Sequence, residues 1–142
     1  MPRILLPVDG SDNALRAVRH IIENQDWYKG ILELHLLNVQ LPIASGLVKT
    51  FISKSQLDDY YRDEGISALE SARAELDDGN VPHHDHVGVG ESAATILDYA
   101  RDKKCDLVVM GTHGHGSLGD ALLGSVASGV LHEAGIPVLL VK

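Results

Sequence analysis

The sequence predicts one α/β domain built on an open parallel sheet with helices on both faces. Short apolar runs alternate with longer segments of helical periodicity along the chain. Strands separated by helices form parallel sheets with right-handed crossovers. The length of 142 residues fits a single domain spanning 1–142, because domains usually run about 100–200 residues. We therefore expect the order β-α-β-α-β-α-β-α-β.

The strands are predicted from apolar runs bounded by glycine, proline or acidic residues. The first run is almost purely aliphatic and ends at Asp9 and Gly10, as expected of a strand buried on both faces. The predicted strands are residues 3–8, 31–39, 81–89, 107–110 and 136–141. The third is more polar than the others.

The helices are predicted from apolar residues at helical spacing. Ser11 is the expected N-cap of the first helix, whose apolar face is Ala14, Leu15, Val18, Ile21 and Ile22. The other helices are residues 53–78, 91–103 and 125–134, the last ending before Gly135. Residues 41–52 are predicted as a connection punctuated by proline and glycine, although it is unusually apolar for a loop. Trp27 and Tyr28 are expected to pack at the end of the first helix.

Composition and charge exclude several classes of protein. The net charge of −8, from 12 basic and 20 acidic residues, argues against sequence-independent nucleic-acid binding, which requires a basic surface. The acidic residues are expected at the surface, and a salt-rich habitat is compatible with them. Cys105 is the only cysteine, so an internal disulfide is excluded and a reducing compartment is the simplest location. The apolar run before Asp9 is too short for a signal peptide or a membrane span. We therefore expect a cytoplasmic protein without membrane insertion.

The glycine-rich segment 111–124 is the strongest candidate for ligand binding. It contains five glycines and joins an apolar strand to a helix. Glycines allow the backbone to approach a ligand closely, and N–H groups at a helix N-terminus favour a phosphate. Ligands of open parallel sheets bind beyond the carboxyl ends of the strands, where this segment and Asp9 are both predicted to lie. A flexible surface loop with a helix cap is the simpler alternative, but five glycines exceed what a cap requires.

Two short glycine patterns match dinucleotide-binding fingerprints only by their letters. Residues 114–119 fit G-x-G-x-x-G, and residues 88–93 fit G-x-G-x-x-A. A dinucleotide fingerprint opens the first βα unit and is followed by an acidic residue near the end of the next strand, and neither pattern meets this condition. The chain also lacks the Gly-Lys-Ser/Thr of a P-loop. Neither NAD binding nor a P-loop is therefore expected.

The spacing of the later glycines is more specific. Gly111 and Gly114, followed after nine residues by Gly124 and Ser125, fit the pattern G-x2-G-x9-G-[S/T]. This pattern resembles the ATP-binding branch of the universal stress protein family. Residues 4–11, 106–111 and 137–141 also resemble that family, so the resemblance covers essentially the whole chain.

The resemblance implies a Rossmann-like fold with strand order 3-2-1-4-5 and bound ATP, with Mg²⁺ or Mn²⁺ on the phosphates. It implies that Asp9 contacts the ribose region, and that Gly111 and Gly114 let the backbone pass close to the ribose and phosphates. The adenine pocket would be lined by Pro7, Val8, Val39 and Met110, and the phosphates would be held by Gly124, Ser125 and Val126. Ala127 stands where the family often has a hydroxyl residue, so one phosphate contact is expected to be absent. The resemblance also implies a homodimer, or a tetramer, formed through the last strand.

Some of these residues have a second interpretation. Asp9 could simply cap the turn into the first helix. His113 could pair with or donate to a phosphate, but a solvated loop histidine is an equal alternative. His115 lies in the variable nine-residue stretch and ranks below His113.

Two other groups of residues invite chemistry that the sequence does not favour. The run from His83 to His86 could bind a metal, but residues 84 and 86 are predicted to share one face of the strand, with 83 and 85 on the other. A polar entry to the strand is therefore preferred. Lys103 and Lys104 could lower the pKa of the Cys105 thiol, but without a resolving cysteine no redox role is expected.

The sequence therefore favours an ATP-binding regulator of stress adaptation that acts on an unidentified protein partner. Hydrolysis is expected to be slow or absent, because residues 111–126 contain no Arg or Lys to stabilise charge at the γ-phosphate. No Ser-His-Asp arrangement or G-x-S-x-G elbow is legible. The alternatives are a dimeric scaffold whose pocket is empty or binds another metabolite, and a weak ATPase. A flavin carrier is disfavoured by the scarcity of aromatic residues near the predicted loops.

Overall fold

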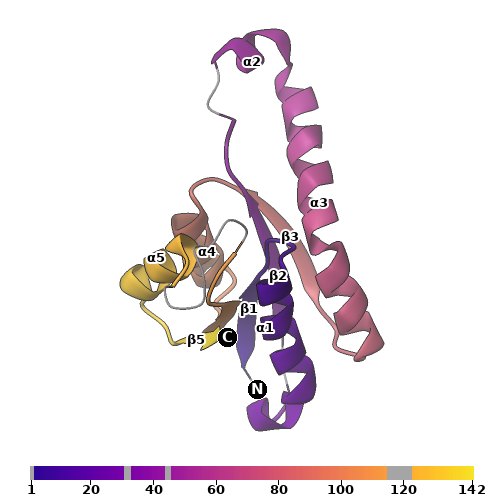
Figure 1. Ribbon diagram of the computed structural model, residues 1–142, viewed down its shortest axis with the longest axis vertical. Coiled ribbons are helices and arrows are strands. Elements are labelled where there is room, and N and C mark those ends of the chain that lie inside the picture. The colour runs from indigo at the N-terminus through magenta and orange to yellow at the C-terminus, as the bar shows by residue number, and fades with distance from the viewer. Residues whose placement is uncertain (1, 31–32, 44–45, 115–122) are drawn as a thin grey trace.

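The computed structural model describes residues 2–30, 33–43, 46–114 and 123–142. Strands and helices alternate along these residues (Figure 1). The strands are β1 (Arg3–Pro7), β2 (Glu33–Gln40), β3 (His84–Val89), β4 (Leu107–Gly111) and β5 (Val138–Val141). The helices are α1 (Asp12–Glu23), α2 (Gly46–Phe51), α3 (Lys54–Asp78), α4 (Ser92–Asp102) and α5 (Ser125–Glu133), with a 3-10 helix η1 (Gln25–Tyr28) after α1. The predicted alternation is confirmed, and α2 and η1 are additions to it.

The five strands form one parallel sheet in the order β3-β2-β1-β4-β5, which confirms the fold class and the strand order. β1 lies at the centre, where Ile4 is the register partner of Leu34 on one side and Leu107 on the other. β3 and β5 form the two edges. The strand order reverses at β1, and this reversal is where open parallel sheets bind ligands.

Helices bury both faces of the sheet. Alternate residues of a strand point to opposite faces, and β1 shows this directly. Ile4 and Leu6 pack in one apolar cluster with residues of α1 and α3, whereas Leu5 packs in a second cluster with residues of α4 and α5. All three side chains are fully buried, which explains why the sequence of β1 is continuously apolar rather than alternating.

Side-chain caps determine where three helices begin. Ser11 caps α1 as predicted, since its hydroxyl accepts a hydrogen bond from the N–H of Ala14 at 3.2 Å. Ser53 and Gln56 form a reciprocal capping box at the start of α3. Glu91 is the N-cap of α4 rather than its first residue, and its carboxylate accepts from the N–H groups of the first turn. These acceptors satisfy backbone donors that a helix leaves unpaired at its N-terminus.

Two strands begin later than predicted because proline cannot donate to a sheet ladder. β3 begins at His84 rather than at residue 81, after Pro82, and the N–H of Val81 instead donates to Leu76 at the end of α3. β5 begins at Val138 rather than at residue 136, after Pro137. The predicted start of β2 at residue 31 lies outside the described residues.

The connection 41–52 is not a simple loop, because it contains α2. Figure 1 shows α2 and the first turns of α3 standing beyond the carboxyl end of the sheet. Trp27 and Tyr28 pack at the end of α1 as predicted, since both rings meet the edge of the His20 ring, although 74% of Trp27 is exposed. Among the described helices, none combines the length and the hydropathy required to cross a bilayer.

Candidate functional site

A cavity of about 600 Å³ opens at the carboxyl ends of β1, β2 and β4. Its volume is in the range typical of small-molecule sites. All eleven residues that the sequence nominated line it: Pro7, Val8, Asp9, Val39, Met110, Gly111, His113, Gly114, Gly124, Ser125 and Val126. The structure thus brings together segments that lie more than 100 residues apart in the chain, and the roles of the individual residues stay predictions.

The end of β1 is fixed by hydrogen bonds to β2. The N–H of Val8 donates to the carbonyl of Leu37 at 2.8 Å, and the side-chain amide of Asn38 donates to the carbonyl of Val8 at 2.8 Å. Asn38 is buried, and its own oxygen accepts from Gln40 at 2.7 Å. This chain of bonds holds the wall formed by Pro7 and Val8 rigidly beside Val39.

Asp9 serves the turn that follows β1. Its Oδ1 accepts a hydrogen bond from the N–H of Ser11 at 2.9 Å, which matches the capping interpretation. Gly10 adopts a φ of 84° in this turn, a conformation that favours glycine. The same carboxylate lines the cavity, so the capping role and a ligand role are compatible.

The glycines after β4 are required by close approach to the start of α1. A Cβ at Gly111 would lie 2.9 Å from the backbone oxygen of Asn13, and a Cβ at Gly114 would overlap the Asp9 carboxylate. Asn13 also accepts a hydrogen bond from the N–H of His113 at 2.9 Å. No sequence signal identified Asn13, because its partner lies 100 residues away.

His113 lines the cavity and has one ring nitrogen without a hydrogen-bond partner among the described residues. Its Nδ1 shares a hydrogen bond of 2.8 Å with the hydroxyl of Thr112. Its Nε2 is buried and has no hydrogen-bond partner in the described parts of the chain. A buried polar atom without a partner costs about 1–3 kcal/mol. His113 thus lines the cavity with one ring nitrogen bonded to Thr112 and the other still without a partner among the described residues.

The N-terminus of α5 faces the same cavity. Gly124 is its N-cap, and within the described residues no side chain caps the first turn. Gly124 lies close to the end of β4, because its N–H donates to the carbonyl of Thr112 at 2.7 Å. Ser125, Val126 and Ala127 line the cavity. Uncapped N–H groups at a helix start favour an anion.

The sequence did not identify several lining residues from the β2–α3 region. Leu41, Ile43 and Tyr60 border the cavity together with Gln40. Tyr61 holds this wall in place, since its hydroxyl accepts from the N–H of Ile43 at 2.8 Å. The apolar character of the segment 41–52 was its only signal in the sequence.

Charge in the cavity is sparse. Within the described residues, its lining contains no Arg or Lys, and residues 115–122, which lie outside them, contain none in their sequence either. His115, the weaker histidine candidate, also lies there. Among the residues that the structure describes, the ionisable side chains that line the cavity are Asp9, His113 and Tyr60. A polyanionic ligand would therefore depend on backbone N–H groups, His113 and a bound cation.

The remaining polar groups do not form a second reactive site. Within the described ranges, no group of three His, Cys, Asp or Glu side chains is placed to hold a metal ion. Burial, aided by the charges of Asp106 and Glu33, raises the pKa of the Cys105 thiol to about 11. The expectation that Lys103 and Lys104 could lower this pKa is wrong, because burial outweighs their charge.

The strand order and the cavity at its reversal define a Rossmann-like α/β protein with a ligand pocket beyond β1 and β4. The model of the universal stress protein family matches residues 1–142, and the chain belongs to this family. The family part of the resemblance is thereby confirmed, and the assignment to an ATP-binding branch stays a prediction.

Individual relatives agree with this assignment. The chain is 34% identical over 145 residues to universal stress protein MJ0531 of Methanocaldococcus jannaschii, covering 99% of this chain and 81% of that protein. The solved structure of MJ0577, from the same organism, is similar with a TM-score of 0.80 at 30% identity, covering 99% of this chain and 95% of that one. A universal stress protein from Archaeoglobus fulgidus, solved in complex with dAMP, has a TM-score of 0.64 at 21% identity, covering 100% and 98%. The last likeness shows the fold alone.

Proposed function

We propose that this chain binds ATP, with Mg²⁺ or Mn²⁺ on the phosphates, and acts as a nucleotide-responsive regulator in stress adaptation. The observation that carries the proposal is the convergence of all eleven nominated residues on one cavity. A relative of the same fold is solved with dAMP, an adenine nucleotide, which supports the chemical class of the ligand.

The residues present fit such a ligand. His113 lines the cavity, its Nε2 has no partner among the described residues, and the glycines at 111 and 114 keep side chains out of the space beside Asp9 and Asn13. The N-terminus of α5 offers N–H groups to an anion. The donors of the cavity thus match the oxygens of a phosphate chain.

We propose a separate part of the lining for each part of the nucleotide. The apolar side chains Pro7, Val8, Val39 and Met110 would bury the base, and Asp9 would accept from ribose hydroxyls. His113, Ser125 and the N–H group of Val126 would bind the phosphates, while Gly124, whose N–H donates to the Thr112 carbonyl, would let the backbone pass close to them. A divalent cation, when bound, neutralises phosphate charge that this cavity does not offset with Arg or Lys.

The same scarcity of charge argues for binding rather than turnover. Phosphoryl transfer requires cationic groups at the γ-phosphate, and the described lining contains no Arg or Lys. We therefore propose slow or absent hydrolysis, with regulation exerted through a protein partner that reads the occupied state. A cytoplasmic homodimer formed through β5 is part of the proposal.

The test is to identify the nucleotide that the purified protein carries and to measure its affinity. Mass spectrometry of the denatured protein should detect an adenine nucleotide, and calorimetric titration of the stripped chain with ATP and Mg²⁺ should give a single site. Gly124→Val should weaken ATP binding at least about tenfold, or about 1.4 kcal/mol. Any Cβ at this position lies 3.2 Å from His113 Cα and from the Thr112 carbonyl oxygen.

Gly135→Val is the matched control, because a Cβ at Gly135 meets no atom within 4 Å. It should bind ATP like the wild type. A protein that releases no nucleotide and gives no heat with ATP would overturn the proposal in favour of a dimeric scaffold.

A further inference from the structure

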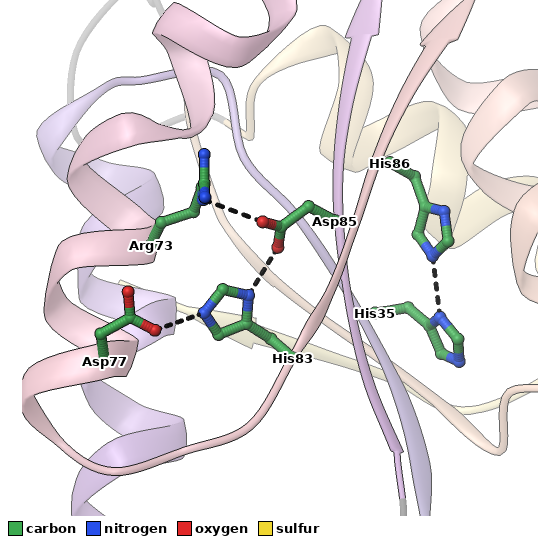
Figure 2. Close-up of polar contacts among 6 residues, drawn as sticks. All are labelled: His35, Arg73, Asp77, His83, Asp85 and His86. Atoms are coloured by element: carbon green, nitrogen blue, oxygen red, sulfur yellow. Dashed lines mark hydrogen bonds and ion pairs between the residues drawn. The ribbon is translucent and has the colours of Figure 1, made fainter.

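His83, just before β3, and His84 and His86 within it lie on opposite sides of this edge strand. Figure 2 shows His83 with its partners on the α3 side, and His86 against His35 of β2 on the opposite side. The sequence predicted this division between odd and even residues. The cluster lies away from the lining of the nucleotide cavity, and its argument does not depend on the proposed function.

The contact on the α3 side requires a protonated histidine. His83 Nδ1 lies 2.5 Å from Asp85 Oδ1, and His83 Nε2 lies 2.8 Å from Asp77 Oδ1. An ionised carboxylate only accepts hydrogen bonds, so both ring nitrogens must carry a proton. Asp85 is held in turn by Arg73 of α3 at 2.8 Å. His83 thus joins β3 to the end of α3 as an imidazolium.

The energetics of His83 follow from this geometry. Burial opposes its charge, but the hydrogen bonds and charges of Asp77 and Asp85 outweigh burial and raise the pKa of His83 above its ordinary value of 6.5. A raised pKa stabilises the folded strand fully below pH 6.5, and this stabilisation is lost as the pH rises through the folded pKa. Alkaline conditions therefore loosen this contact.

The contact on the other side tolerates only one added proton. His35 is buried, and its Nε2 lies 3.0 Å from the carboxylate of Glu33 while its Nδ1 lies 2.9 Å from Nε2 of His86. One imidazole of the pair must donate and the other accept. When both rings are protonated, two N–H groups face each other and two cations repel. The His84 ring stacks on His35 at 5.2 Å between centroids.

The surroundings of His86 also oppose its charge. Burial comes first, followed by His35, Lys103 and His84, and together they lower the pKa of His86 below 6.5, with only Asp85 acting in the other direction. The ring of Tyr99 on α4 packs against it. A lowered pKa stabilises the strand above pH 6.5, and this stabilisation is lost as the pH falls through the folded pKa. Acidic conditions therefore loosen this second contact.

We propose that the attachment of the edge strand β3 acts as a pH gate, which opens at both acidic and alkaline pH. Protonated His83 attaches β3 to α3. A His35–His86 pair that shares at most one added proton attaches β3 to β2. Both contacts are present together near pH 6.5, so β3 is held most firmly at that pH. Loss of the two contacts would also loosen the carboxyl end of β3. Val89 at this end pairs with Gln40, and the N–H of Gly90 donates to the Gln40 carbonyl at 3.0 Å.

Amide hydrogen exchange of the full chain, followed by mass spectrometry from pH 5 to pH 9, tests this gate. After correction for intrinsic exchange rates, the protection of residues 84–89 is divided by that of 107–111 in β4. This ratio should peak near pH 6.5 and fall on both sides, by up to about tenfold per pH unit for each proton exchanged. A ratio that stays flat across this range would overturn the proposal.

Variants separate the two arms of the profile. His86→Gln removes the titrating ring beside His35, so it should abolish the acidic decline and keep the alkaline one. His83→Lys keeps a cation between Asp77 and Asp85, so it should abolish the alkaline decline and keep the acidic one. His132→Gln, at an exposed position of α5, should keep both. Declines that persist unchanged in His86→Gln and His83→Lys would refute the assignment.

Imidazole resonances of the wild-type protein provide a test that needs no substitution. His83 should titrate above pH 6.5 and His86 below it. The reverse order of these two titrations would overturn the proposal.

Discussion

His113 shows how one side chain of the cavity lining could contribute to the proposed ligand site. Its Nδ1 is held by Thr112 and its N–H by Asn13, so its Nε2 cannot turn away to find another partner. We expect His113→Ala to weaken ATP binding at least about tenfold, because a pre-aligned donor is lost. Calorimetric titration of the stripped protein is the measurement.

His132→Ala provides the control for this substitution, because it removes the same side chain from an exposed position on α5. It should leave the affinity for ATP unchanged. Equal affinities of the His113→Ala variant and the wild type would place the ring outside the ligand site.

Cys105 is the opposite case, because its surroundings make its thiol a poor nucleophile. The side chain is buried, and its pKa is raised from an ordinary 9.0 to about 11. Two pKa units leave about a hundredfold less thiolate near neutral pH. We expect alkylation by iodoacetamide at pH 8 to be at least about a hundredfold slower than for free cysteine. A rate near that of free cysteine, measured by mass spectrometry, would contradict this burial.

The packing of α3 on β3 depends on one glycine. A Cβ at Gly65 would overlap both methyl groups of Val87, which faces α3 from the edge strand. We expect Gly65→Ala to lower the free energy of unfolding by about 1–3 kcal/mol through overpacking. This is the reverse of the usual gain of alanine over glycine within a helix. Chemical denaturation measures the effect.

A double-mutant cycle assigns that cost to the contact. Val87→Ala removes the two methyl groups, so Gly65→Ala should cost much less in this background than in the wild type. Gly46→Ala serves as the control, because a Cβ there meets no atom within 4 Å. An equal cost in both backgrounds would mean that the strain lies elsewhere.

The sequence predicted elements and motifs well where the signal is local. Ser11 as the cap of α1 and the strand of residues 107–110 were expected from their neighbours in the chain, and both are found. The cavity was anticipated because Asp9 and the glycine-rich segment both end strands of a parallel sheet. Asn13 and Tyr60 were missed because each joins the site through contacts between segments distant in sequence. The pairing of His35 with His86 was missed for the same reason, since strand register decides it.

At the level of the whole molecule, the two sheet edges differ in how they are protected. β3 is held by charged and polar contacts to α3 and β2. β5 is purely aliphatic and consists of Val138, Leu139, Leu140 and Val141. Among the described strands, it pairs only with β4. An apolar edge strand left unpaired is an aggregation hazard. A second copy of the chain, paired along β5, would remove it.

Val138→Lys tests this arrangement. A charge on β5 should weaken the dimer and shift the sedimentation profile toward a monomer, because like charges would meet across a symmetric pairing of edge strands. Val89→Lys places the same substitution on the exposed end of the other edge strand and should leave the profile unchanged. Val138→Asp should act as Val138→Lys does, since repulsion does not depend on the sign of the charge. A profile that is the same for the wild type and both Val138 variants would assign the dimer, if one forms, to another surface.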